Sequence, residues 1–468
     1  NNDLWELNAG SPDGQTADGS ANEYALRSFF GRLTYDYDNR YLVEANIRRD
    51  GTSRIFKDSR WGVFPSFSGA WRIINEPFME GTRNVLSDLK LRGGWGVLGN
   101  QAISYYSYQS VLDQANYSFG GTVVQGVAPV DGANRDLIWE TTETLNFGLD
   151  MGFLGNQYTL SIEGYRKLTY DILMKLPVST LYGLNAPYQN AGKVKNTGLE
   201  ITAGYKLNTH GWNFQVSANA AYNKNEVMDL KNGGARIWSG KYFNQEGYAI
   251  NSIGGYIAEG LFKTEEEVAN SATIPGTDTA PGDIKYRDIN NDGKIDGEDR
   301  VYIGNTMPKW TFGLNLFAEW KGLDATFLFQ GAADVQGYLA GPGVVGEMIG
   351  AKGKPSYMYR DCWDAETNPN GKFPRAFSSY RQNNSIYNPS SFWIVNSSYL
   401  RLKNFQLGYT LPKEWCNMMG ISRIRVYYSG QNLLTFTKFD KGFDPESPEG
   451  GSSYPQVKTN TFGLNITF

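Results

Sequence analysis

The chain has very little of the chemistry on which most enzymes depend. It contains two cysteines and one histidine among 468 residues. The histidine, His210, lies in Asn208–Gly211, a segment with the composition of a tight turn. Neither a Ser-His-Asp or Cys-His site nor a histidine-based zinc site is therefore available. We expect no catalytic residues in this chain.

Long apolar segments and a strong excess of charge are also absent. No run of about 18 apolar residues occurs, which excludes a membrane-spanning helix. The formal net charge of -4 predicts no nucleic-acid partner. Carboxylates are plentiful, so residue types alone leave a two-carboxylate glycosidase open, but no pair is distinguished by spacing or setting. We expect that the protein is not an enzyme.

The chain does contain regular alternation of apolar and polar residues. Trp310, Phe312, Leu314 and Leu316 alternate with polar residues or glycine, as do Leu145, Phe147, Leu149 and Met151. The last strand-like segment, Thr461–Phe468, alternates strictly and ends on an aromatic residue. This pattern indicates strands with one face toward lipid and the other toward water. We interpret the apolar face of the last segment as a membrane-insertion signal, formed by Phe462, Leu464, Ile466 and Phe468.

Composition agrees with a membrane barrel. Hydrophobic residues make up 40% of the chain, which is too polar for a helical membrane protein, and 14% aromatic residues is high for a soluble one. Abundant tyrosine and glycine suit aromatic girdles and turns. A soluble antiparallel sandwich would also alternate, and it is the competing fold. The fold class that we predict is all-β, a transmembrane antiparallel β-barrel.

The lengths of the connections support this fold. About thirteen strand-like segments occur, and if the C-terminus is periplasmic, every tight turn falls on the periplasmic side. The long connections then all fall on the extracellular side, near residues 98–137, 172–195, 225–308, 336–396 and 437–457. A sandwich needs no such sorting. Cys362 and Cys416 are expected on opposite sides of the membrane, beyond disulfide reach.

A series of short phrases resembles a known family. In order they are Arg48–Ser53, Phe64–Phe67, Leu89–Arg92, Trp139–Thr142, Asn196–Glu200, Tyr399–Asn404 and Gln431–Leu434. The set is similar to the C-terminal barrel of SusC/RagA-type TonB-dependent transporters, and the resemblance covers nearly the whole chain. It implies a barrel of about 22 strands around an N-terminal plug, with residues 1–468 forming the last thirteen or so.

The resemblance also implies partners. An arc of about thirteen strands has two unpaired edges in hydrocarbon, so the N-terminal barrel and plug portion is expected on a second chain or in a missing segment. Implied partners are a SusD-like surface lipoprotein, the TonB complex acting through the absent plug, and lipid of the outer membrane of a Gram-negative bacterium. The implied function is TonB-dependent import of an oligomeric nutrient. An enzymatic barrel and a structural or adhesive barrel are the alternatives from other classes.

Aromatic residues in the long connections are candidates for nutrient binding. Aromatic faces beside Asn, Asp and Arg can hold sugars or peptides, although packing within the loops or an interfacial girdle would explain the same clusters. The family resemblance favours an oligosaccharide, with a peptide as the alternative. The candidate substrate-binding residues are Tyr105, Tyr106, Trp238, Tyr242, Tyr359 and Trp363.

One segment of a long connection has the spacing of a calcium loop. Residues 288–299 place oxygen ligands at loop positions 1, 3, 5, 9 and 12, with Gly293 at position 6 and the Lys294 carbonyl at position 7. The side-chain ligands would be Asp288, Asn290, Asp292, Asp296 and Asp299. Asp299 stands where an EF-hand has Glu, so the loop is nearer to dockerin-type calcium loops. A structural calcium ion is expected, and a metal-free polar turn is the alternative.

The segment Gly94–Gly99 matches the dinucleotide fingerprint G-x-G-x-x-G. That fingerprint needs a helix N-terminus directly after the turn to hold the pyrophosphate. The residues that follow Gly99 enter a long connection instead. We interpret these glycines as small residues in a barrel wall.

Overall fold

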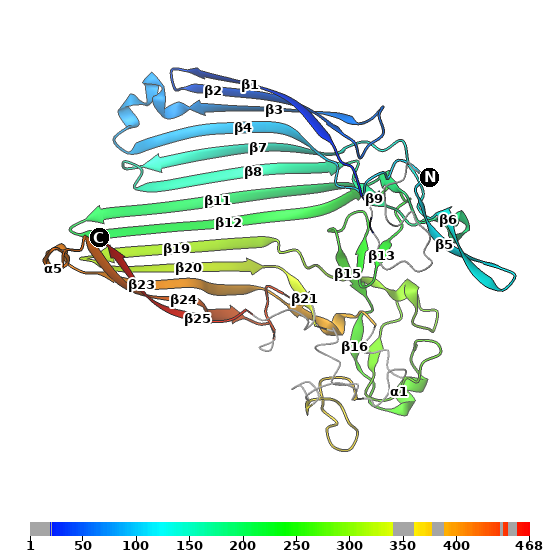
Figure 1. Ribbon diagram of the computed structural model, residues 1–468. Helices are drawn as coiled ribbons and strands as arrows, with labels where there is room; N and C mark the ends of the chain where they lie inside the picture. The colour runs from blue at the N-terminus through cyan, green and yellow to red at the C-terminus, as the bar shows by residue number, and fades with distance from the viewer. Residues whose placement is uncertain (1–18, 20, 340–359, 377–387, 440–442, 448–455) are drawn as a thin grey trace.

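The computed structural model describes residues 19, 21–339, 360–376, 388–439, 443–447 and 456–468. Its main feature is one antiparallel sheet of thirteen strands in sequential order, here called the wall (Figure 1). The strand number and the all-β fold that the sequence predicts are confirmed. The wall strands are β1 (Leu26–Tyr37), β2 (Tyr41–Thr52), β3 (Trp61–Arg72), β4 (Leu86–Asn100), β7 (Glu140–Phe153), β8 (Tyr158–Tyr170), β11 (Lys193–Thr209), β12 (Trp212–Asp229), β19 (Trp310–Trp320), β20 (Leu323–Ala333), β23 (Tyr399–Thr410), β24 (Arg423–Thr437) and β25 (Thr459–Thr467).

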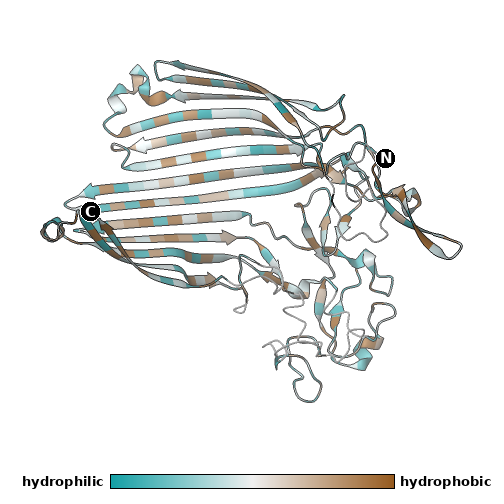
Figure 2. Cartoon of the chain, in the orientation of Figure 1, coloured by the Kyte–Doolittle hydropathy of each residue, from teal (hydrophilic) through white to brown (hydrophobic). Residues whose placement is uncertain are grey.

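Apolar and polar residues alternate along the wall strands (Figure 2). Leu145 pairs with Trp95 on β4 and with Arg166 on β8, and residues in register share one face. The face that carries Leu145 also carries Phe147 and Phe462, which are 61% and 83% exposed. We call it the outward face. Such a large exposed apolar surface is stable only against lipid.

Short connections join the strands at one end of the wall, the turn end. Non-glycine residues in the left-handed conformation shape several of them: Asp38 and Asn39 between β1 and β2, His210 between β11 and β12, and Lys321 between β19 and β20. Two connections contain short helices, namely η2 (Ile73–Asn75) with η3 (Pro77–Thr82), and α5 (Lys413–Met418). The tight turns expected from the sequence are therefore confirmed.

Long connections lie at the opposite end, the loop end, and contain small sheets of their own. A hairpin of β5 (Leu112–Phe119) and β6 (Thr122–Pro129) projects from the connection after β4. The other elements of the loop end are β9 (Leu173–Lys175), η4 (Thr180–Tyr182), β10 (Tyr188–Asn190), β13 (Ile237–Ser239), β14 (Tyr242–Asn244), β15 (Ser252–Gly255), β16 (Ala258–Leu261), α1 (Glu265–Ala269), β17 (Ile284–Tyr286), η5 (Gly297–Asp299), β18 (Val301–Gly304), β21 (Gln336–Tyr338), η7 (Ser391–Trp393) and β22 (Ile394–Asn396).

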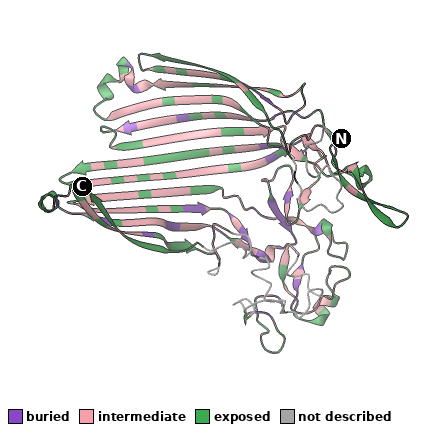
Figure 3. Ribbon diagram, in the orientation of Figure 1, coloured by how far each residue is buried: buried purple, intermediate pink, exposed green. Residues whose placement is uncertain are grey.

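The largest hydrophobic cluster of the described residues lies in these connections, and two smaller clusters include Phe64 of β3 and Val194 and Val227 of β11 and β12. Figure 3 shows buried residues gathered where β15, β16 and β21 meet. We call the described residues of the β12–β19 and β20–β23 connections the loop lobe. Its core includes Ile253, Tyr256, Ile284, Tyr286, Ile295, Tyr338, Leu339, Cys362 and Trp393, and Phe439 packs against them. The wall is a single layer, so its side chains face lipid or the inward space and are rarely buried.

The two cysteines lie at opposite ends of the structure, as the sequence predicts. Cys362 is buried in the loop lobe, and Cys416 is buried in α5 at the turn end. Neither cysteine forms a disulfide bond. Among the described residues, no helix has the length and apolar character needed to cross a membrane.

Two wall strands have a partner on one side only. Within the part of the chain that the structure describes, β1 pairs with β2 alone and β25 with β24 alone. Each unpaired edge presents backbone amides and carbonyls. In hydrocarbon every such group costs several kcal/mol unless it finds a partner.

The same substitution on the two faces of β11 should change stability by different amounts. Ile201, at the middle of the strand, is outward and pairs with Ile162 and Ala220, whereas Thr202 is inward and pairs with Ser161 and Asn219. In the complete barrel folded into lipid vesicles, Ile201→Arg should lower the free energy of unfolding by about 2–4 kcal/mol. Thr202→Arg is the matched control and should change it by less than about 1 kcal/mol. Urea titration measures both, and equal losses would contradict the assignment of faces.

Candidate functional site

The inward face of the wall carries a network of charged side chains. On β4, Lys90 Nζ lies 2.9 Å and Arg92 Nε 3.2 Å from one carboxylate oxygen of Asp150 on β7. Arg92 also pairs with Glu163 on β8. Asn146 donates to the same Glu163 at 2.8 Å. Alternation places these residues together because each strand contributes every second side chain to this face.

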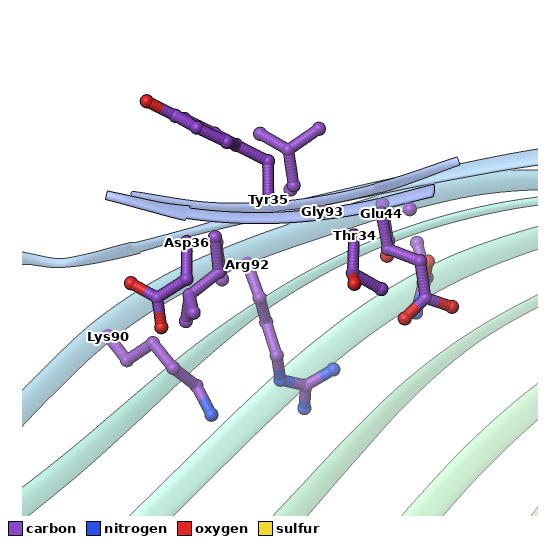
Figure 4. Close-up of a pocket in the computed structure, with 14 residues that line it drawn as sticks. Thr34, Tyr35, Asp36, Glu44, Lys90, Arg92 and Gly93 are labelled. Atoms are coloured by element: carbon purple, nitrogen blue, oxygen red, sulfur yellow. The ribbon is translucent and has the colours of Figure 1, made fainter. Parts of the chain in front are cut away.

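A shallow cavity of about 620 Å³ adjoins this network. Figure 4 shows Thr34, Asp36, Glu44, Lys90 and Arg92 extending from the same side of the sheet, with Tyr35 on the other side. The lining contains both carboxylates and cations. Such a surface can hold a polar polypeptide segment or a hydrated solute through hydrogen bonds and ion pairs.

Inward ion pairs also occur on the later strands. Arg425 on β24 binds Asp324 on β20 through two bonds of 2.9 and 2.5 Å. Asn213 on β12 donates to Glu319 on β19 at 3.3 Å. The inward face is therefore polar from β4 to β24, and it suits a water-filled interior.

A second cavity, of about 640 Å³, lies at the loop end beside β24. The cavity is lined by Arg401, which is 2% exposed and pairs with Asp444 at 2.8 Å and with Glu446 at 3.0 Å. Lys403 shares Glu446 at 3.1 Å. Sequence reasoning did not identify this site, because the acidic partners lie some 40 residues away and only the folded loop brings them together.

The structure separates the predicted aromatic binding residues into different regions. Tyr105 and Tyr106 lie in the connection after β4, with Arg54 4.7 Å from the centroid of the Tyr105 ring. The ring of Tyr105 is 39% exposed. The hydroxyl of Tyr106 accepts a hydrogen bond from the backbone N–H of Glu23 at 2.8 Å. These two rings remain candidates for ligand contact.

The other candidates belong to the loop lobe. Trp238 on β13 packs against Phe243 at 5.2 Å and against the guanidinium of Arg300 at 3.9 Å. Tyr242 on β14 packs against the lobe core. Trp363 is only 7% exposed, so its ring has little free surface to offer a ligand. Tyr359 lies outside the described residues.

An ion pair between a buried carboxylate and a partly exposed arginine joins the two connections of the lobe. Asp283, beside β17, receives two hydrogen bonds from Arg375, at 3.0 and 3.1 Å. The carboxylate is 5% exposed, and burial raises the pKa of Asp283 while the bonds from Arg375 oppose that shift. The pair therefore ties residues of the β12–β19 connection to residues of the β20–β23 connection.

The predicted calcium loop has a well-defined backbone. Gly293 has φ +84°, the left-handed conformation that the sharp turn at position 6 needs. Asp288 accepts bonds from the backbone N–H groups of Asn291 and Gly293 at 2.7 and 2.8 Å. Asp299, which is fully buried, accepts bonds from Ile289 and Asp296 at 2.7 and 2.8 Å. The first and last carboxylates thus both point into the loop.

A lysine side chain neutralises the middle carboxylates of this loop. Lys294 Nζ lies 2.7 Å from Asp296 and 3.3 Å from Asp292. Hydrogen bonds to Asp296 and Asp292 raise the pKa of Lys294 to about 12. Among the described residues, no three acidic, cysteine or histidine side chains converge as a metal centre does. The donor set is that of a hard cation, but Asp292 and Asp296 must turn away from Lys294 to bind one.

Gly94–Gly99 lies within β4, so the strand-to-helix turn of a dinucleotide site does not occur there. His210 lies in the exposed β11–β12 turn, where its Nδ1 is 2.7 Å from the hydroxyl of Thr209. Both segments have the structural roles that the sequence predicts.

A single-layer antiparallel wall with an apolar outward face, a charged inward face and long folded loops at one end defines the wall of an outer-membrane β-barrel. Residues 1–433 match the family described as TonB dependent receptor-like, beta-barrel. The chain belongs to this family. Its localisation to the outer membrane of a Gram-negative bacterium, expected from the sequence, is thereby confirmed.

Individual relatives indicate which type of TonB-dependent receptor the chain is similar to. TonB-dependent receptor P3 of Formosa agariphila is 31% identical over 471 residues, covering 96% of this chain and 46% of that protein. TonB-dependent receptor SusC of Bacteroides thetaiotaomicron is 32% identical over 491 residues, covering 97% and 44%. The solved RagAB peptide transporter superposes with a TM-score of 0.79 at 27% identity, covering 100% of this chain and 50% of that chain.

The resemblance to the SusC/RagA type that the sequence indicates is confirmed by these relatives. The chain spans about half the length of the relatives that it matches.

The inward network predicts a measurable coupling between Arg92 and Glu163. Arg92→Gln removes the cation between two carboxylates, so the free energy of unfolding of the complete barrel should fall by about 1–3 kcal/mol. Glu163→Gln in the same protein should recover part of that loss, because one of the two facing charges is then gone. A double-mutant cycle in lipid vesicles gives the coupling energy. Strictly additive effects would show that the contact contributes nothing to stability.

Proposed function

We propose that this chain is the C-terminal wall of a SusC/RagA-type importer that takes an oligomeric nutrient across the outer membrane. The observation that carries the proposal is the likeness to SusC, at 32% identity over 97% of the chain, combined with a polar inward face. A wall that is lipid-compatible outside and hydrated inside can surround a passage for polar solutes.

The proposal includes the parts that complete the barrel. Strands paired to the free edges of β1 and β25 would satisfy their backbone groups, whether they come from the same polypeptide or from a second one. A plug inside the barrel would face the charged inward surface that Lys90, Arg92 and Glu163 form. TonB would then act on the plug, and the wall itself would do no chemistry.

A SusD-like lipoprotein is the proposed partner at the loop end. Its docking surface would include the loop lobe, which is the largest folded feature beyond the wall (Figure 1). The solved RagAB transporter is described as a peptide transporter, so a peptide is the alternative nutrient to the oligosaccharide that we favour. The support for an oligosaccharide is the exposed aromatic and arginine surface at Tyr105 and Arg54.

The chemical class of the nutrient can be tested in cells that produce the complete transporter. Replacing Tyr105 and Tyr106 together by Ala should lower the affinity for the imported oligosaccharide about tenfold, because two ring contacts are lost. The matched control is Tyr117→Ala, which removes an exposed ring from the β5–β6 hairpin. Uptake of labelled oligosaccharides and of labelled oligopeptides measures the effect.

Deletion of the gene distinguishes the classes of function. Loss of oligosaccharide uptake supports the proposal, and loss of peptide uptake alone moves the substrate to peptide. Intact uptake with loss of adhesion would contradict import and favour an adhesive barrel. Hydrolysis of the nutrient by the purified protein without a partner would favour the enzymatic alternative.

Calcium at Asp288–Asp299 belongs to the proposal as a structural ligand. The ion would be held by Asp288, Asn290, Asp292, Asp296, Asp299 and the carbonyl of Lys294, and would keep this part of the loop lobe rigid. It would take over the neutralising role of the Lys294 ammonium group.

Calorimetric titration of the complete transporter with Ca²⁺ tests this part. The double substitution Asp288→Ala with Asp292→Ala should abolish binding and increase cleavage of the loop by protease. Glu265→Ala with Glu266→Ala removes the same charge from α1 and should leave both properties unchanged. Absence of calcium by elemental analysis, with protease resistance unaffected by a chelator, would refute calcium binding.

A further inference from the structure

Three basic side chains lie together on the outward face of the wall. Arg166 on β8 is in register with Thr197 on β11, and Thr197 is in register with Lys224 on β12. Lys195 lies two residues from Thr197, on the same face. All three belong to the face that carries Leu145 and Phe147, because Arg166 also pairs with Leu145. We call Arg166, Lys195 and Lys224 the basic triplet.

The apolar band of the wall fixes the height of this triplet. Trp212 and Trp320 stack at 5.4 Å near the turn end, and Tyr222 and Trp310 meet at 4.9 Å near the loop end. Ten residues separate the two aromatic pairs on β12. At about 3.3 Å per residue and a tilt of about 40°, this spacing spans about 25 Å, the height of an outer-membrane apolar band.

The triplet begins directly beyond the aromatic pair at the loop end. Lys224 is two residues from Tyr222 toward the loop end and projects from the same face. Lipid headgroups occupy this level in a membrane, next to an interfacial girdle of aromatic residues. The acyl chains would then lie against the apolar band that starts at Tyr222 and Trp310.

The charges of the triplet are only partly neutralised by the protein. Lys195 and Lys224 share a single carboxylate, that of Glu226, at 3.0 and 3.5 Å. Arg166 is exposed, and among the described residues its guanidinium has no ion pair or hydrogen bond. The nearby outward carboxylate of Glu143 accepts a hydrogen bond from Trp95 at 2.7 Å. Three cations therefore stand beside two outward carboxylates, Glu226 and Glu143, and the group keeps a net positive charge.

Outward cations also lie beside aromatic rings near the loop end of the first strands. Arg49 on β2 lies 4.9 Å from the centroid of the Trp61 ring, and Arg27 on β1 lies 5.0 Å from that of Phe29. Trp61 is ten residues from Trp71, which stacks on Tyr41 at the turn end. Arg27 is level with Trp61, and Arg49 is level with Phe29, so these outward cations lie within the loop-end aromatic girdle of the first strands.

We propose that the basic triplet binds the phosphate of a glycolipid in the outer leaflet of the membrane. Guanidinium and ammonium groups bind phosphate through charge-assisted hydrogen bonds, and Arg166 can offer two parallel donors. The site needs only the outer-membrane location of the wall, so it does not depend on which nutrient is imported. The lipid would hold the wall at a defined height and fill the surface between β8 and β12.

The experiment uses the complete transporter in detergent micelles, titrated with purified phosphorylated lipid A and followed by native mass spectrometry. Arg166→Gln with Lys224→Gln should weaken binding about tenfold or more. The matched control, Lys167→Gln with Lys206→Gln, removes two charges from the inward face of β8 and β11 and should leave binding unchanged. Dephosphorylated lipid A should bind the parent protein and the outward variant equally.

Three results would overturn the proposal. One is unchanged binding of phosphorylated lipid A by the outward variant, and another is equal weakening by the inward control, which would indicate a non-specific effect of charge. The third is loss of a co-purifying protein from the outward variant with lipid binding intact, which would assign this face to a protein partner. Resistance of the folded barrel to unfolding in cold detergent confirms that each variant is folded before titration.

Discussion

The constraint on which this structure depends is that a backbone amide in hydrocarbon must find a hydrogen-bond partner. The wall meets it by pairing thirteen strands in sequential order, each bonded to its neighbours in the chain. Because consecutive wall strands pair, the connections at the turn end are short, and the long folded connections lie at the loop end. The inner and outer faces then differ because successive side chains point to opposite sides.

This constraint also explains where the packing energy lies. The wall has no second layer, so most of its outward face is apolar, and charged side chains such as Arg92, Asp150 and Glu163 meet on its inward face. The largest close-packed core of the described residues lies in the loop lobe, around residues such as Ile253 and Trp393. The inward face of the wall is therefore a polar surface suited to water, whereas the loop lobe has a close-packed apolar core.

The sequence predicts the wall well because its signals are local. Alternation and turn composition need only a few neighbouring residues, and they correctly give the strand number, the faces and the tight turns. The loop lobe depends on distant contacts. Nothing near Trp363 signals that its ring is buried, since the residues beside it, such as Gly282 and Lys263, come from the β12–β19 connection.

The candidate sites divide in the same way. The calcium motif is a local spacing, and the structure confirms the turn at Gly293 while leaving the ion itself a prediction. The cavity beside Arg401 and the basic triplet both require strand registers that alternation alone does not specify. Charged residues can be assigned to the outward face, near the lipid headgroups, only when the strand register and the position of the aromatic girdle are known.

The ion pair of Asp283 and Arg375 has a consequence for how these proteins diversify. Each residue comes from a different long connection, and both connections contribute to one core. A change that suits one connection to a new ligand must therefore remain compatible with the other. Exchange of a single loop between two such proteins would leave one charge without its partner. Transfer of both loops together would keep their shared core, so we expect the two loops to change together.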